Sequence, residues 1–186
     1  MKNYLIPNGY WLAIILLCAF AKPMGKRKLM ADKTASTVTY AAKHPMHNWE
    51  GVSRDVNCAM IYNDDTRQPE SIAVSIKVAS FDSDNNNRDS HAIEVLDGLT
   101  YPNVTFSCSD IKANESGTLT AKGNLTFHGI TKPVTVQVTR KESAGKMTMS
   151  GEFPVMLSDY KIERPSLMGM KTEDGIMLRF NVVFAL

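Results

Sequence analysis

The sequence predicts an all-β protein: an antiparallel, up-and-down β-barrel with one short helix near residues 89–97. Three observations carry this prediction. Apolar and polar residues alternate along many short stretches, turn-forming residues separate these stretches, and almost no segment has helical periodicity. With 186 residues, of which 44% are hydrophobic, the chain is long enough for one domain with a substantial core.

The alternation is clearest near residue 74. Ile72, Val74 and Ile76 share one face, whereas Ser71 and Ser75 share the other. Such a pattern predicts a strand with one buried and one solvated face. The same pattern occurs at residues 56–62, 104–108, 119–127, 134–138, 147–155 and 176–184, so at least seven such strands are expected.

Short polar or glycine-containing turns separate the predicted strands, as at residues 63–65, 114–117 and 143–145. Short connections join antiparallel neighbours. Because few helices are available to cover an apolar sheet face, the sheet must cover its own, as a closed barrel or a two-sheet sandwich. The continuous meander order favours the barrel.

Residues 82–94, DSDNNNRDSHAIE, match half of an EF-hand calcium loop. Asp82, Asp84 and Asn86 occupy ligand positions, but Asn87 stands where glycine is needed and Ile93 where glutamate is needed. We expect these side chains to form turns and helix caps instead of a calcium site.

The expected helix follows this turn. Asp89 or Ser90 can cap its N-terminus, Ile93 and Leu96 have helical spacing, and Gly98 stands where a glycine commonly ends a helix.

The first 21 residues have the layout of a secretory signal peptide. Lys2 precedes an apolar run at residues 11–20, and Ala19 and Ala21 form an A-x-A pattern. A membrane anchor is the alternative, but the run is shorter than the roughly 20 residues that span a bilayer. We therefore expect a periplasmic or secreted protein with a flexible segment at residues 22–35 and a barrel domain at residues 36–186.

The charge balance indicates no polyanionic partner. Removing residues 1–21 removes only Lys2, which leaves 20 basic and 19 acidic residues, a net charge of +1. Nucleic acid is therefore not expected as a partner. Cys58 and Cys108 remain in the mature chain, either as one disulfide or as two buried free thiols.

Several linked motifs resemble the YceI family of secreted, lipocalin-like barrels, from about residue 36 to the C-terminus. The residues that carry the resemblance are Arg88, Asp89 and His91; Tyr101, Pro102 and Phe106; Gly123, Leu125, Thr126, Gly129, Thr131, Lys132, Pro133 and Val134; and GEFPVMLSDYKIE at residues 151–163. The hairpin around Trp49 departs from the family's usual sequence.

The resemblance implies a roughly eight-stranded barrel whose apolar interior holds a polyisoprenoid chain, such as an isoprenoid quinone. The implied protein is a non-enzymatic carrier without a resident cofactor. It would meet a membrane only transiently as a lipid source, and it could form a homodimer. Stretches of hydrophobic alternation supply the candidate lining residues: Met60, Ile72, Val74, Ile76, Phe106, Leu125, Phe127, Val136, Met147, Met149, Phe153, Leu178, Phe180 and Val182.

His44, His47 and Trp49 lie in the first predicted hairpin. They could line the rim of the pocket and contact a polar head group such as a quinone carbonyl. Two imidazoles could also contribute to a metal site if a third ligand joins them. Arg88 and Asp89 could anchor the helix as an ion pair or bind an anionic head group, and we favour the anchor.

Two alternatives to the lipid carrier stay open. One is a metal- or haem-linked redox or stress protein that uses the His44 and His47 hairpin. The other is a structural barrel with a filled core and a protein partner.

Overall fold

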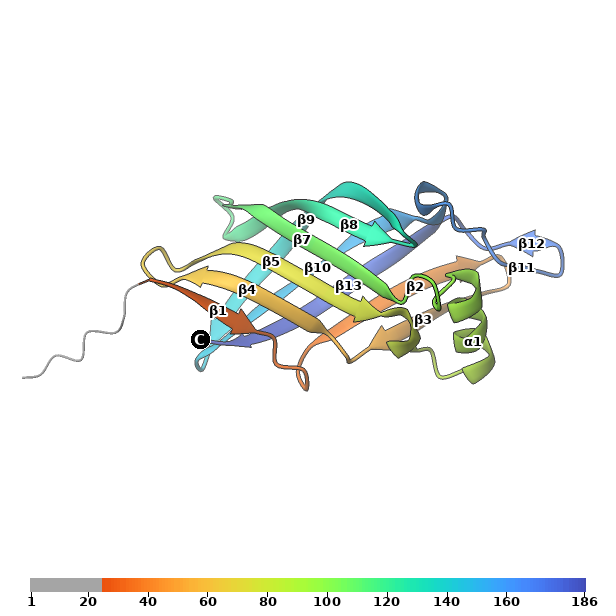
Figure 1. The fold of residues 1–186 in the computed structure, drawn as a ribbon, viewed down its shortest axis with the longest axis horizontal. Coiled ribbons are helices and arrows are strands. Elements are labelled where there is room, and N and C mark those ends of the chain that lie inside the picture. Colours follow the sequence, from red (N-terminus) through yellow and green to blue (C-terminus); the bar gives the residue numbers. More distant parts are fainter. Residues whose placement is uncertain (1–24) are drawn as a thin grey trace, which may run out of the picture.

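The computed structural model describes residues 25–186, most of which belong to one curled sheet (Figure 1). The sheet has 11 strands in the order β1-β4-β5-β7-β8-β9-β10-β13-β2-β3-β6, and neighbours are antiparallel. The bounds are β1 Lys26–Met30, β2 Thr37–His44, β3 His47–Ser53, β4 Asn57–Asn63, β5 Gln68–Lys77, β6 Phe81–Asp82, β7 Asn103–Ala113, β8 Thr118–Phe127, β9 Ile130–Ser143, β10 Lys146–Met156 and β13 Gly175–Ala185.

A separate hairpin is formed by β11 (Ser166–Leu167) and β12 (Met170–Lys171). The helices are α1 (Asn86–Val95) and the 3-10 turns η1 (Val78–Ser80) and η2 (Leu157–Tyr160).

The 11 strands occupy eight positions around the barrel, because three positions are each filled by two consecutive strands with a break between them. β1 and β2 are separated by residues 31–36, β3 and β4 by residues 54–56, and β5 and β6 by η1. β1 pairs with β4 and β2 with β3, and β5 and β6 pair with the same two strands, although the register shifts across the breaks. The expectation of a roughly eight-stranded up-and-down barrel is thereby confirmed.

The C-terminal strand closes the barrel against the N-terminal strands. β13 pairs with β2, where Met177 faces Ala41 and Asn181 faces Thr37. On the other side of the break between β1 and β2, Ala31 forms an isolated bridge with Phe184.

Serine hydroxyls replace part of the hydrogen bonding that the strand breaks remove. Ser36 is buried, and its Oγ accepts a 3.0 Å hydrogen bond from the amide of Val183. Ser53 is fully buried, and its Oγ is 2.7 Å from that of Ser80, which donates to the carbonyl of Lys77. These contacts satisfy buried polar groups that would otherwise destabilise the wall.

The N-terminal segment differs from the prediction. We expected residues 22–35 to be flexible, but Lys26–Met30 form β1, paired with β4. Leu29 is buried, and ion pairs join Lys26 to Glu70 and Arg27 to Asp64. The prediction missed this strand because its basic residues suggested a solvated tail. The signal-peptide prediction concerns residues 1–21, which lie outside the described residues.

Helix α1 begins earlier than predicted. Its N-cap is Asn85, whose side chain accepts a hydrogen bond from the amide of Arg88, so the predicted caps at Asp89 and Ser90 were wrong. Asp97 adopts a positive φ at the C-terminus, and the Gly98 amide donates to the carbonyl of Ile93. This is a Schellman ending with the glycine one position later than expected. Within residues 25–186, no helix is long and apolar enough to cross a membrane.

Three aromatic rings lie where the Cβ atoms of three glycines on neighbouring strands would be if those glycines were replaced by alanine. The rings of Tyr40, Phe106 and Phe180 lie at Gly51, Gly123 and Gly151, each on an adjacent strand. A Cβ atom at Gly123 would lie 2.6 Å from the Phe106 ring, and one at Gly151 would lie 2.8 Å from the Phe180 ring. The rings are therefore held against the barrel wall, an arrangement known from other sheets.

We expect Gly151→Ala to lower the free energy of unfolding by about 1–3 kcal/mol, because the added methyl group overlaps the Phe180 ring and the carbonyl of Gln137. Gly175→Ala is the matched control, since its methyl group would meet only Met156 Sδ, at 3.5 Å. Urea unfolding of both variants tests this. Equal stabilities would show that the ring and glycine contact has no energetic role.

Candidate functional site

The barrel encloses one large cavity of about 590 Å³. Its walls come from the inward faces of the strands, and α1, the β2–β3 hairpin and the residues flanking the β11–β12 hairpin surround its outer end. Figure 1 shows these three segments together at one end of the barrel. We call this end the mouth.

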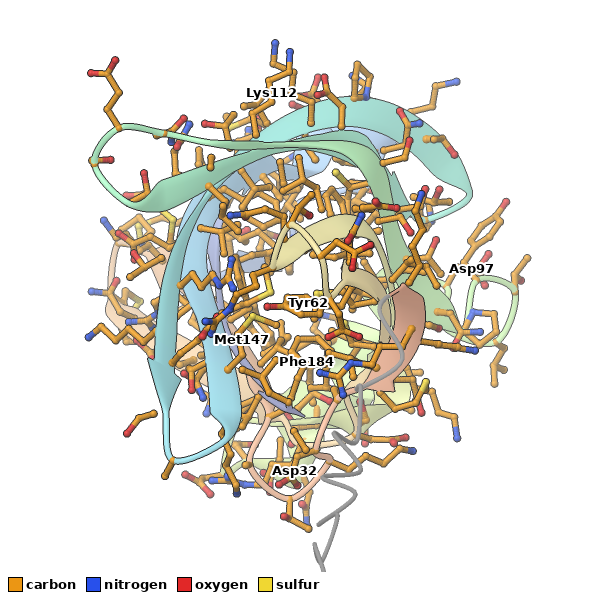
Figure 2. All side chains as sticks on the ribbon, turned by 90° about the vertical axis from the view of Figure 1, so that its left-hand side faces the viewer. Asp32, Tyr62, Asp97, Lys112, Met147 and Phe184 are labelled. Carbon is orange, nitrogen blue, oxygen red and sulfur yellow. The ribbon has the colours of Figure 1, made fainter. Side chains whose placement is uncertain are left out.

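The opposite end is filled with side chains. Figure 2 looks onto this end, where Tyr62, Met147 and Phe184 lie inside the ring of strands. All three are almost completely buried, as are Met60 and Leu29. The Tyr62 hydroxyl accepts a 3.2 Å hydrogen bond from Arg140 Nη2. The cavity is therefore a blind pocket with a packed floor.

The structure brings most of the candidate lining residues together. Met60 and Met147 are the exceptions: they have the expected inward direction but are packed in the core outside the cavity lining. The candidates that line the cavity are His47, Trp49, Ile72, Val74, Ile76, Phe106, Leu125, Phe127, Val136, Met149, Phe153, Leu178, Phe180 and Val182.

The lining residues that were missed include two groups with different origins. Val38, Tyr40 and Ala42 line the cavity from β2, and their period-two spacing was a usable signal. Val95 and Leu96 line it from the end of α1. Their apolar character was visible in the sequence, but the position of α1 over the mouth was not.

His44 connects the two hairpins at the mouth. The ring is buried, its Nδ1 accepts a 3.2 Å hydrogen bond from the Met46 amide, and its Nε2 lies 3.0 Å from the carbonyl oxygen of Met170. Since a carbonyl only accepts, Nε2 must carry the proton and donate. Both nitrogens of His44 are thus engaged by the protein.

A row of rings extends from His44 across the β2–β3 hairpin. The centroids of His44 and His47 are 5.6 Å apart, and those of His47 and Trp49 are 5.2 Å apart. The Arg88 guanidinium lies 5.8 Å from the Trp49 ring, within cation–π range. His47 is exposed, and this row therefore offers polar and aromatic groups at the rim.

Arg88 and Asp89 anchor the start of α1. Both bind Ser83: Arg88 donates to its hydroxyl and carbonyl oxygens, while Asp89 accepts from its amide and hydroxyl. The connection runs through Ser83 and not through a direct ion pair. These contacts agree with the anchoring role that we favoured.

The acidic and amide residues before α1 have local roles. Asp82 accepts a hydrogen bond from the amide of Asp84, and Asn85 caps the helix. Within residues 25–186, no group of three or more His, Cys, Asp or Glu side chains is arranged to hold a metal ion. His44 and His47 therefore have no third ligand among the described residues.

Cys58 and Cys108 are buried free thiols, which resolves the choice between a disulfide and two thiols. Cys58 lines the cavity. Burial raises the pKa of the Cys58 thiol to about 12, and burial also raises the pKa of Cys108.

Thr172, in the segment after β12, is buried and lines the cavity. Among the described side chains, its Oγ1 is the buried polar atom without a hydrogen-bond partner. An unpaired buried hydroxyl destabilises a fold by roughly 1–3 kcal/mol.

A comparison with protein families identifies the fold. A model of the YceI-like domain matches residues 30–184. The chain belongs to the YceI-like domain family. Protein YceI from Salmonella newport (strain SL254) is 27% identical over 140 residues, which cover 74% of this chain and 72% of that protein.

Solved structures share the YceI-like fold. BcnA from Burkholderia cenocepacia superposes with a TM-score of 0.74 at 24% identity, covering 82% of this chain and 98% of BcnA. A polyisoprenoid binding domain from Saccharophagus degradans, implicated in plant cell wall breakdown, has a TM-score of 0.65 at 12% identity, with coverages of 84% and 97%. At these identities the similarity establishes the fold alone.

We expect Cys58 to resist alkylation in this YceI-like protein, although it lines the cavity. Raising its pKa from 9.0 to about 12 reduces the thiolate fraction about a thousandfold at pH 8. Peptide mapping after iodoacetamide treatment, in buffer and in urea, measures this. Modification of the Cys58 peptide at similar rates in both conditions would contradict the prediction.

Thr172→Val should raise the free energy of unfolding by about 1 kcal/mol, because it replaces an unpaired buried hydroxyl with a methyl group of similar shape. Thr120→Val is the control. Its Oγ1 lies 3.0 Å from Gln137 Oε1, so this variant should lose about 1 kcal/mol. Urea unfolding compares the two, and a loss of stability in Thr172→Val would be the contrary result.

Proposed function

We propose that this protein is an exported, non-enzymatic lipid-binding protein that holds a polyisoprenoid or isoprenoid-quinone-like chain in its barrel, for transport, storage or a stress response. The observation that carries the proposal is the blind cavity of about 590 Å³ with an apolar wall. Its volume lies within the range of roughly 300–1,000 Å³ typical of small-molecule sites.

The wall selects for an apolar chain. The inward residues of the barrel wall are mainly Val, Ile, Leu, Phe and Met, while most polar lining residues lie near the mouth. A polar ligand deep in the barrel would lose its hydration without gaining partners. A prenyl or acyl chain instead gains about 0.8 kcal/mol for each buried methylene.

The polar head of the ligand would remain at the mouth. His47 and Trp49 line the cavity there, and the exposed imidazole of His47 can donate to a quinone carbonyl. His44 is less suited to this contact because both of its ring nitrogens already have partners.

The comparisons and the sequence add independent support. The domain from Saccharophagus degradans, which has the same fold, is described as polyisoprenoid binding. The signal-like layout of residues 1–21 supports export to the periplasm or beyond.

The alternatives have less support. A metal- or haem-linked role would need more ligands than the His44 and His47 pair supplies among residues 25–186. A structural barrel with a filled core does not agree with a cavity of this volume.

The test is mass spectrometry of the organic extract of purified protein, followed by reloading with isoprenoid quinones. Val74→Phe and Ile72→Phe each place a ring in the cavity from β5. If the ring displaces two methylenes of the ligand, affinity should fall on the order of tenfold. Ala73→Phe is the matched control, because the exposed Ala73 lies on the opposite face of the same strand.

A prenyl species in the extract, retained by Ala73→Phe and reduced in the two cavity variants, supports the proposal. A lipid-free extract from folded protein that also fails to take up added quinones overturns it. Equal occupancy in all three variants would place the lipid outside the barrel.

A further inference from the structure

Two hairpin tips at the mouth expose methionine side chains to solvent. Met46 lies at the tip of the β2–β3 hairpin and is 55% exposed, whereas Met168 lies at the tip of the β11–β12 hairpin and is 80% exposed. Met170, on the same hairpin, is 39% exposed. We call residues 43–48 and 164–171 the mouth hairpins.

Hydrogen bonds join the two mouth hairpins, and we call the surface that they form together the ledge. His44 Nε2 donates to the Met170 carbonyl at 3.0 Å, and the Glu173 amide donates to the carbonyl of Lys43 at 2.8 Å. The exposed methionines of the two tips therefore belong to one surface beside the cavity opening.

The charged side chains of the mouth hairpins themselves are all positive, although two acidic residues flank the β11–β12 hairpin. Residues 43–48 and 164–171 contain Lys43, Arg164 and Lys171 but no Asp or Glu. Among residues 25–186, none of these three cations has an acidic partner within ion-pair distance. Glu163 and Glu173 lie at the base of the β11–β12 hairpin.

Helix α1 and the turn before it, which also border the mouth, carry exposed acidic side chains. Asp82 and Asp84 precede α1, and Glu94 lies within it, all three exposed. Arg88 in α1 is already bound to Ser83. The border of the mouth thus combines basic, methionine-bearing hairpin tips with an acidic segment around α1.

We infer that the mouth hairpins dock onto an anionic membrane surface. Met46, Met168 and Met170 enter the boundary between head groups and acyl chains, while Lys43 and Lys171 contact lipid phosphates. The acidic side chains around α1 are repelled by the same surface, so the hairpin tips make the contact. The inference rests on the proposed function, because a lipid cargo must enter and leave through a membrane.

The shape of the ledge favours a membrane over a protein partner. Its exposed apolar groups are flexible methionine side chains on hairpin tips that also carry cations, whereas stable protein interfaces favour aromatic residues and are depleted in lysine. Such a pattern suits partial insertion at a lipid interface.

The first experiment locates the contact on the full chain. Met168→Trp and Leu99→Trp are each mixed with phosphatidylglycerol vesicles that contain brominated lipid, and the fluorescence is compared with that of the unmodified chain. Leu99 is the control because it follows α1 and is 93% exposed. We expect the added tryptophan to be quenched at position 168 and not at position 99. Equal quenching, or quenching at neither position, would overturn the inference.

The second experiment measures partition onto vesicles by co-sedimentation. Met46→Ser should weaken partition about fivefold, whereas Met30→Ser, at a position 57% exposed in β1 at the other end of the barrel, should leave it unchanged. Lys43→Gln combined with Lys171→Gln should weaken it at least about tenfold. The matched control pair, Lys28→Gln in β1 with Lys141→Gln in β9, changes two exposed lysines outside the mouth hairpins and should have no effect. Losses that are equal in the paired variants would contradict docking through the ledge.

Lipid occupancy separates this inference from the proposed function. The side chains of Met46 and Met168 are outside the cavity lining, so the Met46→Ser and Met168→Ser variants should hold preloaded isoprenoid quinone as the unmodified chain does. Normal occupancy without quenching at position 168 would overturn the docking surface alone. Absence of any bound lipid would instead overturn the proposed function.

Discussion

The hollow interior depends on the placement of three aromatic rings against the barrel wall. Small eight-stranded barrels can fill their interior with side chains, and large aromatic residues fill space most readily. Here Phe106 and Phe180 occupy the space left by Gly123 and Gly151 on the neighbouring strands. Tyr40 lies against Gly51 in the same way, so the aromatic residues that could have filled the barrel form part of its wall, and the absent side chains of three glycines leave room for a ligand.

The two ends of the barrel have different physical characters. The floor is closed by buried side chains such as Met147 and Phe184, and the mouth is bordered by short segments held by a few polar contacts. Ser36 and Ser53 bond across the breaks in the wall, so three strand positions can change direction without leaving buried backbone groups unpaired.

Alternation in the sequence predicted which side chains point into the barrel but not their position along the barrel axis. It identified the inward faces of the long strands and the meander order, because both follow from local spacing and turn chemistry. Met60 and Met147 show the limit: they point inward as expected, but their height along the barrel axis depends on strand register, which places them outside the cavity lining. The strand at Lys26–Met30 was missed because its pairing with β4 provides a stability that its own composition does not indicate.

Closure of the barrel by β13 against β2 also determines the order in which the chain can fold. Hairpins such as β8–β9 can form as soon as their residues leave the ribosome, whereas Thr37 must wait for Asn181, almost the whole length of the domain away. Contacts so distant in sequence slow the final step of folding. The barrel therefore cannot close before its C-terminal strand is available, and the cavity exists only after that strand has been made and has paired.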